Sequence, residues 1–260
     1  MVADLTDVEL VGVVLAAGEG RRLRPLSEIL AKALCPVGNV PLLDLALRRL
    51  EPVATDLAVN VHYHRDSLIR HLAASEADVH LSVEKPEALG TAGALGALRD
   101  WVSGRGVVVH NADAYLTEDL ARLVHRWDGS RCRVLVAPAS GRADFGAVRF
   151  VGVSLLPWAV VRDLRPIPSG LYEVVWRDAW AAGELDLVEA RGPAVDCGTP
   201  SDYLRANLLA SGGQSVIGPG ARVSGEVVRS VVWPGAVVEA GERLVESIRA
   251  GAGLTVSAPL

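Results

Sequence analysis

The first half of the chain alternates apolar strand patterns with helical patterns. The strand patterns are short runs of aliphatic, often β-branched residues, and they cover Val8–Ala16, Leu57–Val61, Val79–Val83 and Val107–His110. A helical pattern follows each of them, at Pro41–Leu50, Asp66–Ala74, Thr91–Trp101 and Thr117–Trp127. A continuous apolar run is typical of a strand covered on both faces, and parallel strands need crossover helices between them. The alternation therefore predicts an α/β fold, with a Rossmann-like, mostly parallel sheet and helices on both faces.

Less regular patterns continue to residue 212. Arg133–Pro138 and Gly146–Val153 have the composition of strands, and Leu171–Ala182 and Pro200–Ala210 have helical spacing. Thr199 directly precedes the last helix, at the position where a threonine commonly caps a helix. We therefore expect residues 1–212 to form one domain.

The amino-acid composition changes in residues 213–260, which are rich in glycine and valine. Gly218-Pro219-Gly220 and Pro234-Gly235 recur as turn signals. Aliphatic residues return at intervals of about six, as expected of a hexapeptide repeat. This segment predicts a short left-handed β-helix of about two coils, with an ordinary small β-meander as the alternative.

Composition and charge limit the kinds of function that the chain can have. Hydrophobic residues make up 50% of the 260 residues and charged residues 22%, so the chain can bury a sizeable core. The net charge of −5, without a long run of like charges, argues against a nucleic-acid partner. The acidic N-terminus is unlike a secretory leader, and no apolar stretch approaches the roughly 18 residues of a membrane span. This apolar pattern predicts no membrane partner, and three widely spaced cysteines predict reduced thiols and thus a cytoplasmic protein.

The segment Leu15–Pro25, LAAGEGRRLRP, directly follows the first predicted strand. Glycines at 18 and 20 allow backbone N–H groups to turn toward a phosphate, and arginines at 22 and 24 add positive charge. No Walker A string occurs in the chain, and a dinucleotide fingerprint would need glycine where Leu23 stands. The segment predicts a phosphate-binding loop, and a purely structural glycine turn is the alternative for the glycines alone.

This loop, followed by Lys32 in AKALCPVGNVPLL, resembles the opening of the sugar-nucleotide pyrophosphorylases. Arg21 stands where that family usually has threonine, and Ala33 where it has proline. Three later strings also resemble the family: Leu89–Leu95 (LGTAGAL), Val107–Asp113 (VVVHNAD) and Val195–Leu204 (VDCGTPSDYL). Within the family, the chain is most similar to mannose-1-phosphate guanylyltransferases that carry a short hexapeptide-repeat tail.

The resemblance implies an enzyme that joins a sugar 1-phosphate to a nucleoside triphosphate, with GTP and mannose 1-phosphate as the leading pair and Mg²⁺ as the cofactor. It assigns catalysis to Arg22, Lys32 and Asp113, the metal to Asp113 and Asp196, and the sugar phosphate to Asn111 and Gly146. It places the nucleotide at Ala16, Ala17, Gly18, Glu19, Gly20, Arg22, Glu84, Gly90 and Thr91. Such a reaction is a single displacement, in which the charges of the phosphates are balanced by the metal and by fixed cations.

One family feature is missing. The family carries a later Glu-Lys-Pro string whose lysine contacts the sugar phosphate, but here Phe145–Phe150 continues directly into Val151–Pro157. Arg142 or Arg149 could supply that charge instead. The gap leaves a non-catalytic nucleotide-binding regulator open beside the enzyme, and the strings leave a uridylyltransferase or a cytidylyltransferase open beside the guanylyltransferase. A homo-oligomer is a further expectation, because the valine-rich tail leaves strand edges to cover.

Overall fold

The structure is a computed structural model that describes residues 6–75, 77–139, 141–251 and 253–260. The chain divides into two compact units, and each is assembled from separate stretches. One, which we call the sheet unit, comprises Met1–Gly18, Ala46–Ala112 and Thr117–Ala194. The other, which we call the tail unit, comprises Glu19–Leu45, Asp113–Leu116 and Val195–Leu260. The expected domain boundary after residue 212 stays a prediction.

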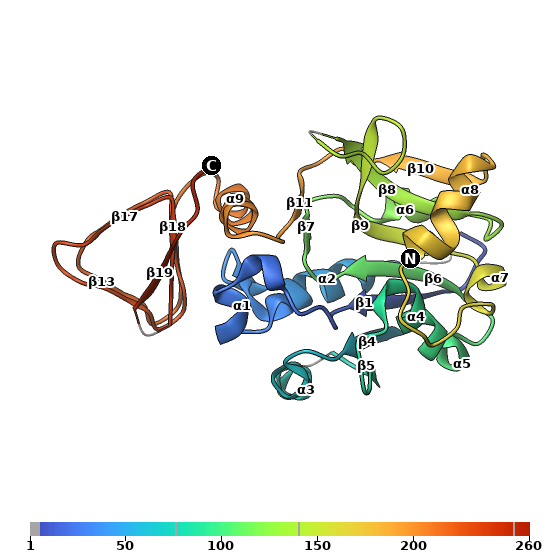
Figure 1. Ribbon diagram of the computed structural model, residues 1–260, viewed down its shortest axis with the longest axis horizontal. Coiled ribbons are helices and arrows are strands. Elements are labelled where there is room, and N and C mark those ends of the chain that lie inside the picture. The colour runs from blue at the N-terminus through green and yellow to red at the C-terminus, as the bar shows by residue number, and fades with distance from the viewer. Residues whose placement is uncertain (1–5, 76, 140, 252) are drawn as a thin grey trace. The chain divides into compact units, whose positions relative to one another are not determined.

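A seven-stranded sheet forms the centre of the sheet unit (Figure 1). Its strand order is β10-β8-β9-β6-β1-β4-β5. The strands are β1 (Leu10–Leu15), β4 (Leu57–Val61), β5 (Val79–Val83), β6 (Gly106–Asn111), β8 (Cys132–Pro138), β9 (Val148–Leu156) and β10 (Leu185–Glu189). Only β9 runs antiparallel to its neighbours within this sheet, so the predicted mostly parallel sheet is confirmed.

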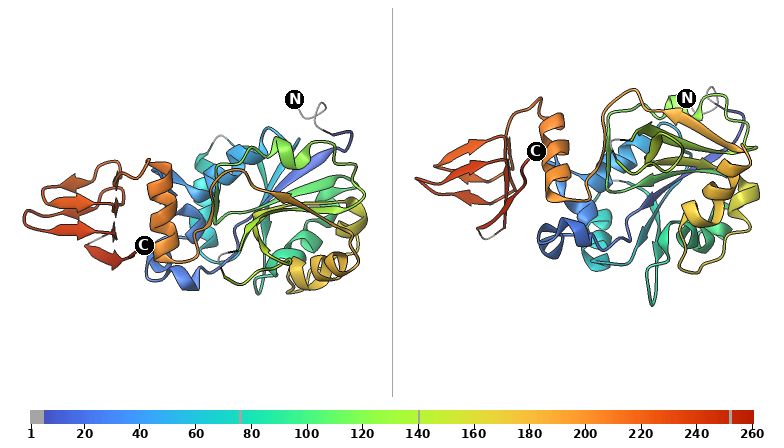
Figure 2. Two further views of the ribbon diagram at one scale, coloured as in Figure 1. Left: turned by 90° about the horizontal axis from the view of Figure 1, so that it is seen from above. Right: turned by 45° about the horizontal axis from the view of Figure 1, so that its top comes forward.

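Both faces of this sheet are covered (Figure 2). On one face, Val11 and Val13 pack in a core with Leu95 and with Trp176. The helical segments on that face are α4 (Gly90–Ala97), α5 (Arg99–Val102), α7 (Trp158–Val161) and a turn of π-helix, η4 (Tyr172–Trp176), which continues into α8 (Arg177–Ala181). On the other face, Gly106 lies against Trp127, which follows α6 (Ala121–Val124). The unit also contains helix α3 (Arg65–Ala74).

The predicted helix Thr117–Trp127 is wrong over most of its length, because only α6 is helical there. The backbone N–H of Thr117 donates to Pro193 instead, at 3.2 Å. The side chain of Glu118 is buried and accepts from the backbone N–H groups of Arg191 and Gly192. These long-range hydrogen bonds hold the start of the segment in an extended form, which overrides its helical spacing.

The tail unit contains a stack of short parallel strands, visible as superposed arrows in Figure 2. They are β12 (Val216–Ile217), β13 (Arg222–Val223), β14 (Glu226–Val228), β15 (Val231–Val232), β16 (Val237–Val238), β17 (Arg243–Val245) and β18 (Ser247–Ala250). β12, β15 and β18 stack on one side, β13 and β16 on a second, and β14 and β17 on a third. β19 (Leu254–Ser257) adds an antiparallel partner to β18. The arrangement is consistent with a short β-helix, and its left hand stays a prediction.

The core of the tail unit joins this stack to helix α9 (Pro200–Ala210). Tyr203 and Leu204 of α9 are fully buried with Val231 and Ile248 of the stack. The indole Nε1 of Trp233 donates to the hydroxyl of Tyr203 at 3.0 Å, and that hydroxyl donates to the carbonyl of Pro36. The unit also holds the short segments η2 (Arg21–Leu23), α1 (Leu26–Ile29), η3 (Lys32–Leu34), β2 (Pro36–Val37), β3 (Val40–Pro41) and β7 (Ala114–Leu116). Two elements, α2 (Leu42–Leu50) and β11 (Ala194–Asp196), contain points where the chain passes between the units.

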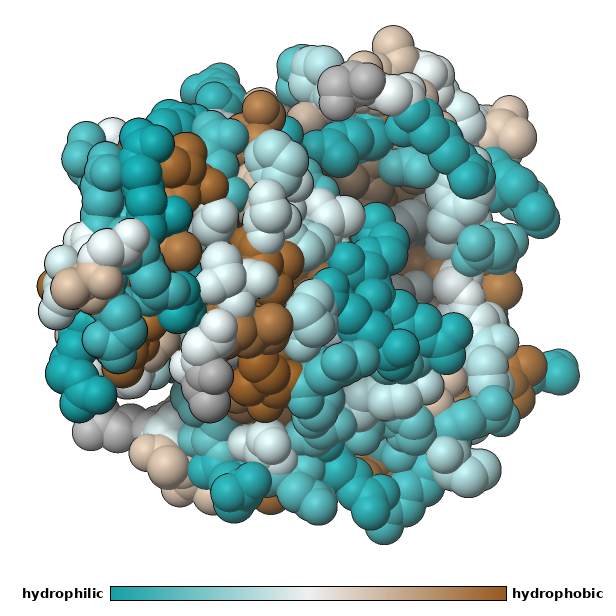
Figure 3. Space-filling view, turned by 60° about the vertical axis from the view of Figure 1, so that its left-hand side comes forward, coloured by the Kyte–Doolittle hydropathy of each residue, from teal (hydrophilic) through white to brown (hydrophobic). Residues whose placement is uncertain are grey.

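Some aliphatic side chains of the stack face outward. Ile217, Val223 and Val245 are 40%, 39% and 44% exposed. Figure 3 looks at the side of the molecule that carries the stack, where hydrophobic residues form patches among hydrophilic ones. Self-association stays a prediction. Among the described residues, none of the helices combines the length and the apolar character that crossing a bilayer requires.

Candidate active site

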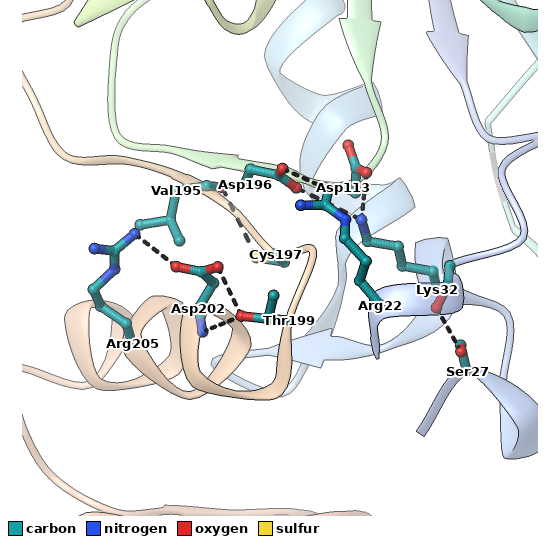
Figure 4. A network of polar contacts seen from close by, with 11 residues as sticks. Arg22, Ser27, Lys32, Asp113, Val195, Asp196, Cys197, Thr199, Asp202 and Arg205 are labelled. Carbon is teal, nitrogen blue, oxygen red and sulfur yellow. Dashed lines mark hydrogen bonds and ion pairs between the residues drawn. The ribbon is translucent and has the colours of Figure 1, made fainter. Parts of the chain in front are cut away.

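Four charged side chains, from the three stretches that form the tail unit, meet within it (Figure 4). The ammonium Nζ of Lys32 lies 2.5 Å from Asp113 Oδ2 and 3.6 Å from Asp196 Oδ1. The guanidinium Nη2 of Arg22 lies 3.1 Å from Asp196 Oδ2. The structure therefore brings together the residues predicted for catalysis and metal binding, although more than 160 positions of sequence separate Lys32 from Asp196.

Lys32 is the most enclosed member of this cluster, with 9% of its side chain exposed. Burial alone would lower its pKa, but the Asp113 carboxylate, its hydrogen bond and the Asp196 carboxylate together raise the pKa above the ordinary lysine value. Lys32 thus stays charged at neutral pH. Gly20 packs beside it, because a Cβ at Gly20 would lie 3.0 Å from Lys32 Cβ, and Gly20 has a left-handed φ of 70°.

The Arg22 side chain is exposed. It lies in η2, which begins after Gly20. Gly198 lies beside the Arg22–Asp196 ion pair, because a Cβ there would lie 2.7 Å from Arg22 Nη2 and 3.0 Å from Asp196 Oδ1. Glycine at 198 therefore leaves the space in which Arg22 reaches Asp196.

The string around Asp196 fixes the second carboxylate by pairing and by capping. β11 pairs with β7, and the backbone N–H of Cys197 donates to the carbonyl of Asp113 at 2.9 Å. Thr199 then caps α9 as predicted, because its hydroxyl accepts from the Asp202 N–H at 3.2 Å and donates to the Asp202 carboxylate at 2.7 Å. A strand end and a helix start thus hold Asp196 next to Asp113.

The two aspartates fit a divalent cation. Among the described residues there is no group of three or more His, Cys, Asp or Glu side chains that could hold a metal ion. Mg²⁺ needs only one or two carboxylates when phosphate oxygens complete its shell. Asp113 and Asp196 converge on one ammonium group and remain 34% and 49% exposed, so both can be reached by a cation and a phosphate.

The other charges of the loop are paired with each other. Glu19 accepts from Arg21 Nε at 2.5 Å and from Arg24 Nη2 at 2.6 Å. Arg24 also lies 3.5 Å from Glu28. In the structure, the Glu19 carboxylate thus pairs with an arginine at the start of η2 and with one directly after it. Its predicted role at the nucleotide stays a prediction.

The predicted nucleotide residues of the sheet unit form a hydrogen-bonded network of their own. Glu84 is 2% exposed, and its Oε2 accepts from the Leu89 N–H at 2.7 Å. Its Oε1 accepts from the side chain of Asn60 at 2.7 Å, and Asn60 in turn accepts from the Ala16 N–H at 2.8 Å. Sequence reasoning missed Asn60. The available signal was a polar residue inside an otherwise apolar strand, which must find partners when it is buried.

Gly90 and Thr91 begin α4 against the segment 165–171. A Cβ at Gly90 would lie 2.5 Å from the carbonyl oxygen of Ser169, and Gly90 has a φ of 68°. The Thr91 hydroxyl accepts from the Leu171 N–H at 2.8 Å. The glycines of this string therefore allow the backbone of residues 165–169 to approach α4 closely. Contact of Gly90 and Thr91 with a nucleotide stays a prediction.

The two residues predicted for the sugar phosphate lie on β6 and in a turn. Asn111 ends β6, at the carboxyl end of a parallel strand, where open α/β sheets bind ligands. Gly146, with a φ of 63°, lies in a two-residue turn closed by reciprocal hydrogen bonds between Phe145 and Val148. β9 then runs without interruption to Leu156, so the loop that carries the family's second lysine is absent.

Comparison with known proteins identifies relatives. The family model described as Nucleotidyl transferase matches residues 11–153. A probable mannose-1-phosphate guanylyltransferase of Oryza sativa subsp. japonica is 28% identical over 89% of this chain and 79% of its own length. An N-acetylmuramate alpha-1-phosphate uridylyltransferase of Caulobacter vibrioides is 34% identical over 75% of this chain and 95% of its own length. The structure of HddC from Yersinia pseudotuberculosis shares the fold, with a TM-score of 0.64, 19% identity, and coverage of 76% of this chain and 97% of that one.

Proposed function

Because the chain belongs to the nucleotidyl transferase family, we propose that it condenses a sugar 1-phosphate with a nucleoside triphosphate and releases pyrophosphate. The family membership makes it a nucleotidyltransferase, and the proposal concerns its substrates and its residues. The observation that carries the proposal is the convergence of Asp113, Asp196, Lys32 and Arg22 within one unit. Two carboxylates with two adjacent cations can handle polyphosphate and a divalent cation together.

Asp113 and Asp196 would hold the divalent cation, for which Mg²⁺ is the proposed identity. When bound, the cation supplies charge neutralisation at the phosphate groups and helps to align them. Lys32 and Arg22 would contact phosphate oxygens and stabilise the charge that accumulates on departing pyrophosphate. Ion pairs with the aspartates hold the Lys32 and Arg22 side chains in place before substrate binds. This reduces the entropic cost of ordering these two side chains during the reaction.

A covalent protein intermediate is not part of the proposal. Burial raises the pKa of Cys35 and of Cys132 to about 12, and burial also raises the pKa of Cys197, the cysteine next to Asp196. All three thiols are buried and free. A protonated, buried thiol is a poor nucleophile. The phosphate oxygen of the sugar would therefore attack the nucleotide directly, with departure of pyrophosphate in the same step.

For the base and the sugar, guanine and mannose are the leading proposal. The similarity to the rice guanylyltransferase supports it, because that similarity extends over 89% of this chain. A uridylyltransferase is the second candidate. The Caulobacter relative supports it, since it has the higher identity and is matched over 95% of its length. Magnesium as the ion, a cytoplasmic location, and the absence of nucleic-acid and membrane partners stay predictions from the sequence.

Arg149 is our candidate for the cation that replaces the missing lysine. It follows the Gly146 turn at the start of β9, and its Nε is buried without a hydrogen-bond partner among the described residues. A buried guanidinium N–H without a partner gains a charge-assisted hydrogen bond when a phosphate reaches it. We expect Arg149→Met to raise the KM for the sugar 1-phosphate by about tenfold or more, with a smaller effect on the KM for the nucleotide.

Pyrophosphate release tests the proposed function. Purified protein with Mg²⁺ is assayed with GTP, UTP, dTTP, CTP and ATP against a panel of sugar 1-phosphates. Asp113→Asn should abolish turnover, whereas Asp66→Asn, at an exposed position of α3, should leave it unchanged. Turnover with one pair of substrates identifies the activity. Nucleotide binding without turnover for any pair would instead favour the regulatory relative that lacks the loop lysine.

A further inference from the structure

Asn60 connects two segments that the sequence assigned to the nucleotide. It lies in β4 opposite Leu15 of β1 and is 2% exposed. Its Oδ1 accepts from the backbone N–H of Ala16, at the first position after β1. Its Nδ2 donates to Glu84, which accepts the backbone N–H of Leu89 on its other oxygen. One buried amide and one buried carboxylate therefore tie the start of the phosphate loop to the N-terminus of α4.

Glu84 fixes the orientation of the side-chain amide of Asn60. A carboxylate only accepts hydrogen bonds, so the NH₂ group of Asn60 must face it. The carbonyl Oδ1 is then left to face Ala16, whose N–H can only donate. An amide rotated by half a turn would set a carbonyl oxygen against the carboxylate and an NH₂ against an N–H. Glu84 thus determines which end of the Asn60 side chain meets the loop.

Glu84 is enclosed by these contacts, and this limits what it can do at a nucleotide. Both of its oxygens are used by protein N–H groups, and 2% of its surface is exposed. In addition, Nδ1 of His62 lies 3.1 Å from the backbone carbonyl oxygen of Glu84, so the main chain of this residue is held as well as its side chain. The carboxylate is therefore suited to positioning two segments rather than to touching a ligand.

We propose that Asn60 is a positioning residue for nucleotide binding, and that Glu84 acts through it: the pair orients the Ala16 N–H and the start of α4, so that the loop holds a nucleotide in one geometry. This inference rests on the proposed function and deepens it, because it assigns a role to a residue outside every string that resembles the family. It also replaces a direct contact by Glu84 with an indirect one.

Single substitutions at Asn60 or Glu84 should disrupt these hydrogen bonds. A double substitution that moves the carboxylate from position 84 to position 60 should restore them. Asn60→Asp places a second carboxylate against Glu84. Glu84→Gln leaves either the Asn60 NH₂ or the Leu89 N–H facing a donor. In the double variant Asn60→Asp/Glu84→Gln, the new carboxylate at position 60 would accept from the Ala16 N–H and from the new NH₂ group at position 84. The amide carbonyl at position 84 would then accept from Leu89. All donors are satisfied again, with the same net charge as the parent.

Nucleotide affinity is the first readout, measured with GTP and with UTP by calorimetry, together with KM and kcat. We expect each single variant to bind the preferred nucleotide about tenfold or more weakly, and the double variant to recover to within about threefold of the parent, because coupled residues are not additive. The loss should appear in KM more than in kcat. Single variants that bind as well as the parent, or a double variant no better than the weaker single, would overturn the proposal.

Asn207→Asp is the matched control. Asn207 is another fully buried asparagine, whose Oδ1 accepts a backbone N–H, from Gly38, and whose Nδ2 donates to two carbonyls. Its substitution should reduce unfolding stability without changing the nucleotide KM of the folded fraction, and Glu84→Gln should not rescue it. A nucleotide KM raised as much as in Asn60→Asp would mean that any buried amide defect produces the effect.

Amide hydrogen exchange separates this proposal from the proposed function. The Ala16 N–H should exchange faster in both single variants and regain protection in the double variant, whether or not a nucleotide is present. A parent that is folded but binds none of GTP, UTP, dTTP, CTP and ATP refutes nucleotide binding, and with it the positioning role, even if the exchange pattern is as expected. Exchange at Ala16 that is identical in all four proteins refutes the network itself while leaving the proposed function intact.

Discussion

Gly198→Ala should damage catalysis without damaging the fold. The added Cβ would lie 2.7 Å from Arg22 Nη2, whereas ordinary contacts begin at 3.4 Å, so the guanidinium would retreat by about 0.7 Å to reach an ordinary contact. Arg22 is long and exposed and can move, and Gly198 does not have a left-handed φ. The substitution therefore displaces one cation of the site and leaves the backbone in place.

The size of each effect follows from this geometry. A misplacement of about 1 Å can cost up to about a hundredfold in rate, so we expect kcat to fall between about tenfold and a hundredfold. The exposed Arg22–Asp196 pair contributes at most about 1 kcal/mol to stability. Alanine in place of glycine restores about 0.4–1 kcal/mol by restricting the unfolded chain. The free energy of unfolding should therefore change by less than about 1 kcal/mol.

Two measurements check this prediction. Pyrophosphate release gives kcat, and urea unfolding gives the free energy of unfolding. Gly141→Ala is the control, because a Cβ there meets nothing within 4 Å and φ is not left-handed, so kcat should match the parent and the free energy of unfolding should rise by about 0.4–1 kcal/mol. Activity of Gly198→Ala within about twofold of the parent would refute the reasoning, since the displaced guanidinium would then not contribute to the reaction.

Three further predictions concern the loop, the core and pH. Gly18→Ala should not lower the free energy of unfolding, because its Cβ meets nothing within 4 Å, but should weaken nucleotide binding measured by calorimetry if phosphate lies against that backbone. Trp233→Phe removes the donor to the Tyr203 hydroxyl and should lower the free energy of unfolding in urea by about 1 kcal/mol. Burial lowers the pKa of His110 to about 4, so its unfolded form takes up a proton below pH 6.5 while its folded form does not, and stability falls as pH falls through that window. His110→Leu should remove about 3 kcal/mol of this loss between pH 6.5 and pH 4 in unfolding curves, whereas His125→Leu, at an exposed position, should leave the pH dependence of the parent.

The strands and helices with strong patterns could be predicted from the sequence almost to the residue. β4, β5 and α9 have the predicted bounds, because β4 is almost wholly apolar, β5 alternates apolar and polar residues, and α9 begins at a capping threonine. β7 and β11 were missed, since segments of three residues carry no periodicity and owe their form to pairing with each other. Local spacing favoured a helix after Thr117, and distant backbone partners decided otherwise.

The cluster of Arg22, Lys32, Asp113 and Asp196 was predictable because each residue lies in a string that resembles the family. What the sequence could not provide is how the charges are distributed among partners. Arg24 appeared as available as Arg22, yet Arg24 is paired with Glu19 and Arg22 with Asp196. Such pairings depend on where side chains end in space, which spacing along the chain does not encode.

The order in which the chain is made has a consequence for this site. The tail unit takes its residues from three stretches, and the last of them begins at Val195. Proteins are synthesised from the N-terminus, and their folding units complete as their residues emerge. When residue 194 has been added to the growing chain, every stretch of the sheet unit has been synthesised. Asp196 has not, and neither has Tyr203, whose side chain is buried in the core of the tail unit. The charged cluster is therefore completed only after the whole sheet unit has been synthesised, and a product truncated before Val195 would have the sheet without the complete charged cluster.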